Sequence, residues 1–160
     1  MTTAFVYNMN GRNGKWSRYE LPYPVDAFSQ LSGELFIRTG DRIVRVVDGL
    51  LTDHVDGVDV PFGGTVWWPY VDWGVPAATK KLGGLDLVAA GKPSVSVLWD
   101  QRDNTKATEP YAIDPDTWTG GVIPMPLMAP SFGVKVEFEP GHAWSLTSLT
   151  LYLSQTKGQP

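Results

Sequence analysis

Alternating apolar and polar residues in the segment 132–139 constrain the fold of this chain more than any other feature. Every second residue there is apolar: Phe132, Val134, Val136 and Phe138. The segment 94–100 repeats the spacing, with Val95, Val97 and Trp99 on one side. A period of two is that of a half-buried β-strand, and nowhere do helix caps accompany an apolar stripe of period 3.6 over ten residues. The sequence therefore predicts an all-β chain in which these residues share one core.

The first 50 residues contain short apolar segments separated by turn residues. We expect strands at 4–9, 16–21, 27–31, 34–39 and 42–47. The connections carry typical hairpin residues, with two Asn-Gly pairs in 10–14, then Ser32-Gly33 and Gly40-Asp41. Short connections join neighbouring antiparallel strands. Residues 1–50 are thus predicted to form one antiparallel meander resembling a single propeller blade.

The segment 51–64 has little periodicity and carries three aspartates and three glycines, so we expect a linker there. Residues 65–160 are predicted to form an antiparallel β-sandwich, although the whole chain could also be one continuous domain. Prolines confine part of this region to edge strands and extended connections: Pro110, Pro115, Pro124, Pro126 and Pro130. In 144–153 the apolar positions change from even to odd numbers, which predicts a β-bulge or a switch between sheets.

Composition excludes several classes of protein. The net charge is −4 and there is no run of Lys or Arg, so general nucleic-acid binding is not expected. The absence of cysteine removes disulfides and thiolate chemistry, and it suits assembly in a reducing cytoplasm. The N-terminus lacks a basic, then apolar, signal pattern, and no stretch of about 18 apolar residues occurs. We expect neither secretion by a signal peptide nor membrane insertion.

The best candidate for a metal site is His54, which lies among Asp53, Asp56 and Asp59. Their spacing does not follow the alternating ligands, central glycine and closing Glu of a calcium-binding loop. A solvated loop is therefore the prediction, with no metal and no cofactor.

The sequence also offers few candidate catalytic groups. His54 and His142 accompany neither a nucleophile elbow nor a zinc-protease motif. Glu137 and Glu139 share one side of a strand, as a glycosidase pair could, but Lys135 beside them favours an ordinary charged surface. Gly91-Lys92-Pro93-Ser94 lacks the spacing of a phosphate-binding loop. We therefore expect no enzyme and no catalytic residue.

The segment 65–73 is apolar on both sides, so it should be covered by protein on both faces. This pattern predicts a subunit interface formed by four aromatic residues: Trp67, Trp68, Tyr70 and Trp73. The alternative is that tryptophans, Trp99 included, stack against sugar rings.

Seven motifs, in this order and spacing, resemble the C-terminal region of tail nozzle and hub proteins of short-tailed bacteriophages, also described as packaged-DNA stabilisation proteins. They are WSRYELPYPVDAF (16–28), LSGELFIRTGDRIVRVVD (31–48), KKLGGLDLV (80–88), SVSVLWD (94–100), IPMPLMAPS (123–131), WSL (144–146) and LYL (151–153). The resemblance spans nearly the whole chain. In that family the region usually ends a longer polypeptide with a propeller-like body, which leaves open whether this chain is a separate subunit or part of a longer nozzle protein.

The resemblance implies a structural virion protein that forms a ring, sixfold in the family, below the portal and adaptor. Such rings seal packaged DNA, hold tail fibres or spikes and line the DNA exit channel. DNA would then be passive cargo, with which the acidic balance agrees. The chain would be assembled in the host bacterial cytoplasm and reside in the virion tail. Two alternatives remain open: a carbohydrate- or receptor-binding β-sandwich module of a phage tail, and a cell-wall hydrolase.

Overall fold

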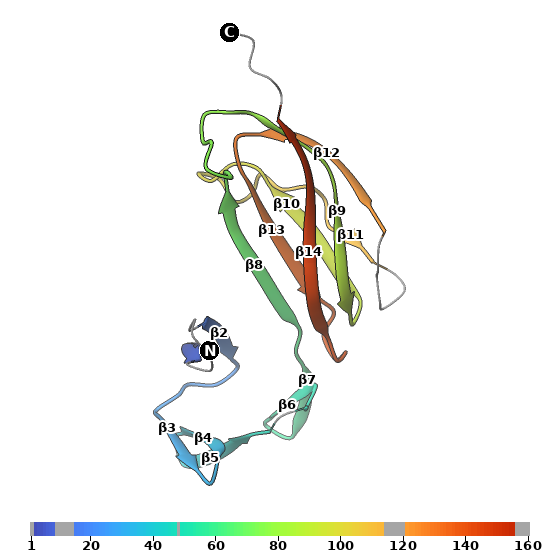
Figure 1. Ribbon diagram of the computed structural model, residues 1–160. Coiled ribbons are helices and arrows are strands. Elements are labelled where there is room, and N and C mark those ends of the chain that lie inside the picture. Colours follow the sequence, from blue (N-terminus) through green and yellow to red (C-terminus); the bar gives the residue numbers. More distant parts are fainter. Residues whose placement is uncertain (1, 9–14, 48, 114–120, 156–160) are drawn as a thin grey trace. The chain divides into compact units, whose positions relative to one another are not determined.

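The computed structural model describes residues 2–8, 15–47, 49–113 and 121–155. All regular elements among them are β-strands, and neighbouring strands run antiparallel (Figure 1). The all-β prediction is confirmed. The chain divides into two compact units. The first comprises Met1–Leu50 with His54–Asp59, and the second comprises Leu51–Asp53 with Val60–Pro160.

The described residues of 1–50 form two separate sheets rather than the single meander that the sequence predicted. A hairpin pairs β1 (Thr2–Asn8) with β2 (Lys15–Leu21). A three-stranded sheet has the order β3-β4-β5: Ala27–Leu31, Glu34–Thr39 and Arg42–Val46. Pro22 and Pro24 separate the two sheets in sequence. Because proline lacks the N–H that a sheet ladder requires, the chain leaves the first sheet there.

The turns of the β3-β4-β5 sheet are made by the residues that the sequence predicted. Ser32 and Gly33 both have positive φ, at 53° and 85°, as a two-residue hairpin turn requires. Gly40 has a φ of 58°, and its N–H donates to the Asp26 carboxylate at 2.6 Å. The Asn-Gly pairs of 10–14 lie outside the described residues.

The segment predicted as a linker contains a hairpin of β6 (Thr52–Val55) and β7 (Val58–Pro61). Asp56 and Gly57 form its turn with φ values of 50° and 85°. An Asp-Gly pair between short β-branched segments is a hairpin signal that the aspartate-rich composition obscured. The boundary between the two units passes through this hairpin.

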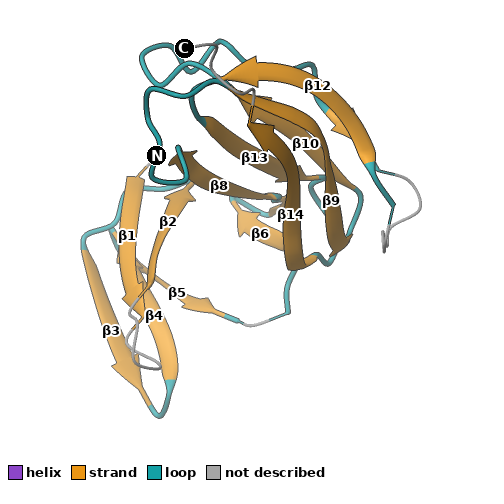
Figure 2. Cartoon of the chain, turned by 45° about the horizontal axis from the view of Figure 1, so that its top comes forward, coloured by secondary structure: helices purple, strands orange, loops and turns teal. Residues whose placement is uncertain are grey.

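The second unit packs two sheets face to face, and Figure 2 shows them as layers. One sheet has the order β11-β10-β13-β8: Tyr111–Ala112, Pro93–Leu98, Phe132–Phe138 and Gly64–Val71. The other has the order β12-β9-β14: Ile123–Ala129, Lys80–Ala90 and Ser145–Gln155.

The core lies between these sheets and contains the predicted residues. Val95, Val97, Phe132, Val134, Val136 and Phe138 are buried, and Trp99 packs against them. The opposite sheet contributes a matching apolar side: Leu82, Leu85, Leu87, Ile123 and Met125. The predicted sharing of one core is therefore confirmed.

Two irregularities were also expected. The register of β14 on β9 shifts between Leu146 and Ser148, so the bulge predicted from the phase change is confirmed. Pro124 and Pro126 lie in β12, which is an edge strand of its sheet and has a register shift after Pro124. An edge strand tolerates prolines because one row of its N–H groups has no ladder partner.

The Lys80 side chain is a buried cation at the start of β9. It is only 2% exposed. Its ammonium donates to the carbonyls of Val75, Ala78 and Pro130, the last two at 3.0 and 2.7 Å. The three acceptors satisfy the charge and tie the 72–79 loop to the connection between β12 and β13.

Candidate functional site

The outer face of the larger sheet carries exposed aromatic, charged and hydroxyl side chains, so it is the best candidate for a functional site in the second unit. Exposure along the edge strand β8 alternates from residue to residue. Trp68 packs against the core, whereas Trp67 points away from it and is 47% exposed. Within one chain, therefore, only one side of β8 is covered. Coverage of the other side by a neighbouring subunit stays a prediction.

A bulge in β8 changes which residues face outward. Val134 pairs with Trp68 but Phe132 pairs with Val71, so β8 has one more residue than β13 over this stretch. Beyond the bulge, a Cβ on Gly133 would lie 3.6 Å from the ring of Tyr70. Tyr70 therefore lies over the outer side of Gly133.

The Tyr70 hydroxyl is committed within the chain. It donates to the Asp100 carbonyl at 2.7 Å and lies 3.2 Å from Asn104 Oδ1. Burial, together with the carboxylates of Asp100 and Asp103, raises the pKa of Tyr70 above its ordinary value. The phenol thus stays a hydrogen-bond donor that fixes the loop after β10.

Trp73 has a different environment from Trp67. It follows β8 with a φ of 53°, and its ring lies 6.4 Å from that of Phe132 at an angle of 58°. Trp73 is 42% exposed, so it covers one end of the core and also meets solvent. Of the four aromatic residues predicted as an interface, Trp67 and Trp73 are exposed, whereas Trp68 packs against the core and Tyr70 is hydrogen-bonded within the chain. Their role as a subunit interface stays a prediction.

Polar side chains occupy the rows next to Trp67. Lys135 on β13 pairs across the strands with Trp67, and Glu137 pairs with both Thr65 and Ser94. The Lys135 ammonium lies 2.7 Å from the Glu137 carboxylate. One aromatic ring thus stands beside a neutralised ion pair and two hydroxyl groups.

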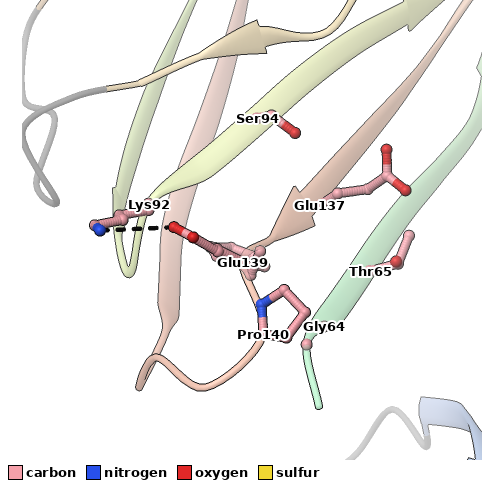
Figure 3. A pocket seen from close by; sticks show the side chains of 9 residues that line it. Gly64, Thr65, Lys92, Ser94, Glu137, Glu139 and Pro140 are labelled. Atoms are coloured by element: carbon pink, nitrogen blue, oxygen red, sulfur yellow. Dashed lines mark ion pairs between the residues drawn. The ribbon is translucent and has the colours of Figure 1, made fainter. Parts of the chain in front are cut away.

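An open depression of about 560 Å³ adjoins this row. Figure 3 shows Ser94, Thr65 and Glu137 around it, with Glu139 directed toward Lys92. The ion pair Lys92–Glu139 measures 3.6 Å.

His142 Nε2 also approaches the Glu139 carboxylate, at 3.7 Å. Glu137 and Glu139 therefore each have a cationic partner of their own. This pairing favours a charged surface over a glycosidase acid and base, and the absence of an enzyme stays a prediction.

Sequence reasoning missed the packing of Trp144 against Phe138 and Gly64. The Trp144 ring stacks on that of Phe138, with centroids 4.5 Å apart and planes at 16°. A Cβ on Gly64 would lie 2.4 Å from a carbon of the Trp144 ring. Only a glycine permits this approach, and the Gly63-Gly64 pair just before an apolar strand was the available signal.

We expect Gly64→Ala to lower the free energy of unfolding by about 1–3 kcal/mol, because the new methyl group must displace the Trp144 ring from Phe138. Urea unfolding, with near-ultraviolet circular dichroism for the tryptophan environment, measures this. Gly83→Ala is the matched control, since its Cβ would meet only the Tyr152 carbonyl at 3.6 Å and should change stability by about 0.5 kcal/mol at most. Equal losses in both variants would contradict the close approach of Trp144.

The candidate metal ligands are divided among separate ion pairs. His54 Nδ1 lies 2.8 Å from Asp59, whereas Asp56 pairs with Arg42 at 2.7 Å. Burial raises the pKa of Asp53. Within the described ranges, no three His, Asp or Glu side chains gather as a metal ion would need. Gly91 and Lys92, in the segment whose spacing did not fit a phosphate-binding loop, form the turn between β9 and β10.

No helix long and apolar enough to cross a bilayer occurs in the described part of the chain. No family model, no curated protein and no solved structure matches the chain. The resemblance to tail nozzle proteins therefore stays an expectation drawn from the sequence motifs alone.

Proposed function

We propose that this chain is a structural, non-enzymatic component of a bacteriophage virion tail, part of the nozzle or hub ring below the portal and adaptor. In that ring it helps to seal packaged DNA and to form the exit channel. The resemblance of the sequence motifs supports the choice of this family. The uncovered apolar side chains of the β3-β4-β5 sheet are the observation that best supports an assembling subunit.

That sheet has almost no core of its own. Among the described side chains of the first 50 residues, only Ile37 is buried. Leu31 and Ile43 are 67% and 75% exposed, and Phe28 is 53% exposed. An apolar depression of about 440 Å³ lies over the sheet, lined by Ala27, Phe28, Ser29, Leu31, Phe36, Arg38 and Ile43.

The strand pairing places apolar residues on both faces of this sheet. Phe28, Ile37 and Val44 are cross-strand neighbours on one face. Ile43 lies on the other face, opposite Arg38. A small sheet needs apolar cover to be stable, and uncovered apolar area on a soluble protein marks an interaction surface. Identical subunits in a ring can supply such cover to each other through head-to-tail contacts.

The test replaces Ile43 with aspartate. We expect the purified chain to form closed rings in negative-stain images, and Ile43→Asp to shift it to monomers in light scattering while the β content is retained. The new carboxylate faces Arg38 across the strands, so the sheet itself should tolerate it. Met128→Asp is matched, because Met128 is 60% exposed and faces Lys81. It should leave the rings intact.

Two results together would overturn the proposal. One is a monodisperse monomer of the unaltered chain at high concentration, and the other is complete tails on virions that lack the protein.

A further inference from the structure

The exposed indole of Trp67 has no role in the core and stands beside polar groups. Tryptophan is usually well covered in folded proteins, yet 47% of Trp67 is open to solvent. Its cross-strand neighbour is Lys135, and Thr65 lies two residues earlier on the same side of β8. Such a combination of one aromatic ring and a few convergent polar groups is typical of ligand sites.

The dimensions of the sheet suit a chain of sugar rings. Neighbouring strands lie about 4.8 Å apart, and residues two apart on one face are separated by about 7 Å. Glu137 pairs across the strands with both Thr65 and Ser94, so these three polar residues form one line across the sheet. Trp67 and Lys135 form the next such line, two residues further along β8. The indole and the line of polar residues are therefore about one sugar ring apart, and the depression beside Lys92 continues the same direction (Figure 3).

The charges on this face select the class of ligand. Lys135 is paired with Glu137 at 2.7 Å, and Lys92 with Glu139 at 3.6 Å. Each cation is balanced by a carboxylate, so an anionic polymer would meet two glutamates without a surplus of positive charge. The side chains of Lys135 and Glu137 are still 32% and 42% exposed, so they can exchange water for the hydroxyls of a neutral ligand.

We propose that the outer face of the β10-β13-β8 strands binds a neutral oligosaccharide. The indole of Trp67 stacks on the C–H face of one sugar ring. Lys135 donates to sugar hydroxyls, Glu137 accepts from them, and the hydroxyls of Thr65 and Ser94 complete the line. This activity is separate from ring formation, since it uses the second unit and not the β3-β4-β5 sheet.

The experiment applies the full chain to an array of neutral and anionic bacterial surface glycans and then measures affinity for the best neutral oligosaccharide by titration calorimetry. We expect Trp67→Ala to weaken binding by about tenfold or more and Trp67→Phe to weaken it less, because the smaller ring still stacks. Glu137→Gln should weaken binding as well. Tyr152→Ala is the control, since Tyr152 is 45% exposed but lies on β14 of the other sheet.

Light scattering on the same samples separates this inference from the proposed ring. If binding is lost in Trp67→Ala while the oligomeric state is unchanged, the saccharide site is supported. If no neutral glycan binds, or if Tyr152→Ala weakens binding as much as Trp67→Ala, the inference is overturned. If Trp67→Ala disrupts the rings and leaves glycan binding unchanged, Trp67 is a subunit contact and the inference is overturned too.

Discussion

Val136→Asp is expected to lower the free energy of unfolding of the second unit by roughly 3–5 kcal/mol, because it places an unpaired carboxylate in the core. Val136 is 0% exposed and lies in the middle of β13, between Val95 on β10 and Val66 on β8. No cation of the core is positioned to pair with the new charge among the described residues, since the only buried charged side chain there, Lys80, is held by carbonyls. Urea unfolding followed by circular dichroism measures the loss.

Glu137→Gln is the control on the opposite side of the same strand. It removes one member of a partly exposed ion pair, which contributes little to stability, so the change should stay within about 0.5 kcal/mol. If the two variants lose equal stability, the assignment of inner and outer faces is wrong.

Lys80→Met is expected to cost roughly 3–5 kcal/mol, although it keeps most of the apolar stem. The ammonium of Lys80 is the shared donor for the carbonyls of Val75, Ala78 and Pro130. Removing it leaves these part-buried acceptors without that donor, and an acceptor that loses its partner away from water costs about 1–3 kcal/mol. The midpoint of urea unfolding should fall accordingly, and limited proteolysis should cut the 72–79 loop faster.

Lys81→Met provides the comparison one residue along β9, where the side chain is exposed. Its effect should be within about 0.5 kcal/mol. A Lys80→Met protein as stable as Lys81→Met, with an equally protected loop, would show that the three carbonyl contacts do not hold the loop.

Strand positions and their sides were predictable because they depend on local spacing. The parity of Val134 and Val136 places them on one side of any extended strand, whatever the partner. The bulge in β14 was predictable for the same reason, since the apolar phase changes between Leu146 and Leu149. The β6-β7 hairpin was missed although its Asp56-Gly57 turn is also a local signal, because the acidic composition was given more weight.

The candidate site was less predictable. The aromatic run from Trp67 to Trp73 predicted a subunit interface, which stays a prediction. Strand alternation alone places Trp67 and Trp68 on opposite sides, whereas the position of Tyr70 depends on the bulge in β8, which lies between Trp68 and Val71. That bulge depends on how β8 aligns with β13, which is more than 50 residues away in sequence. Nothing within the run itself encodes this register.

By itself, the sequence determined the all-β class, the inner and outer sides of individual strands and most of the turns, because periodicity and turn chemistry act over a few residues. Only the tertiary structure decided which strands are neighbours, such as β9 beside β14, and which apolar residues are covered. Lys80 illustrates the difference, since its partner Pro130 is 50 residues away. Many alternative strand pairings have similar local preferences. The packing of the whole unit determines which of them forms.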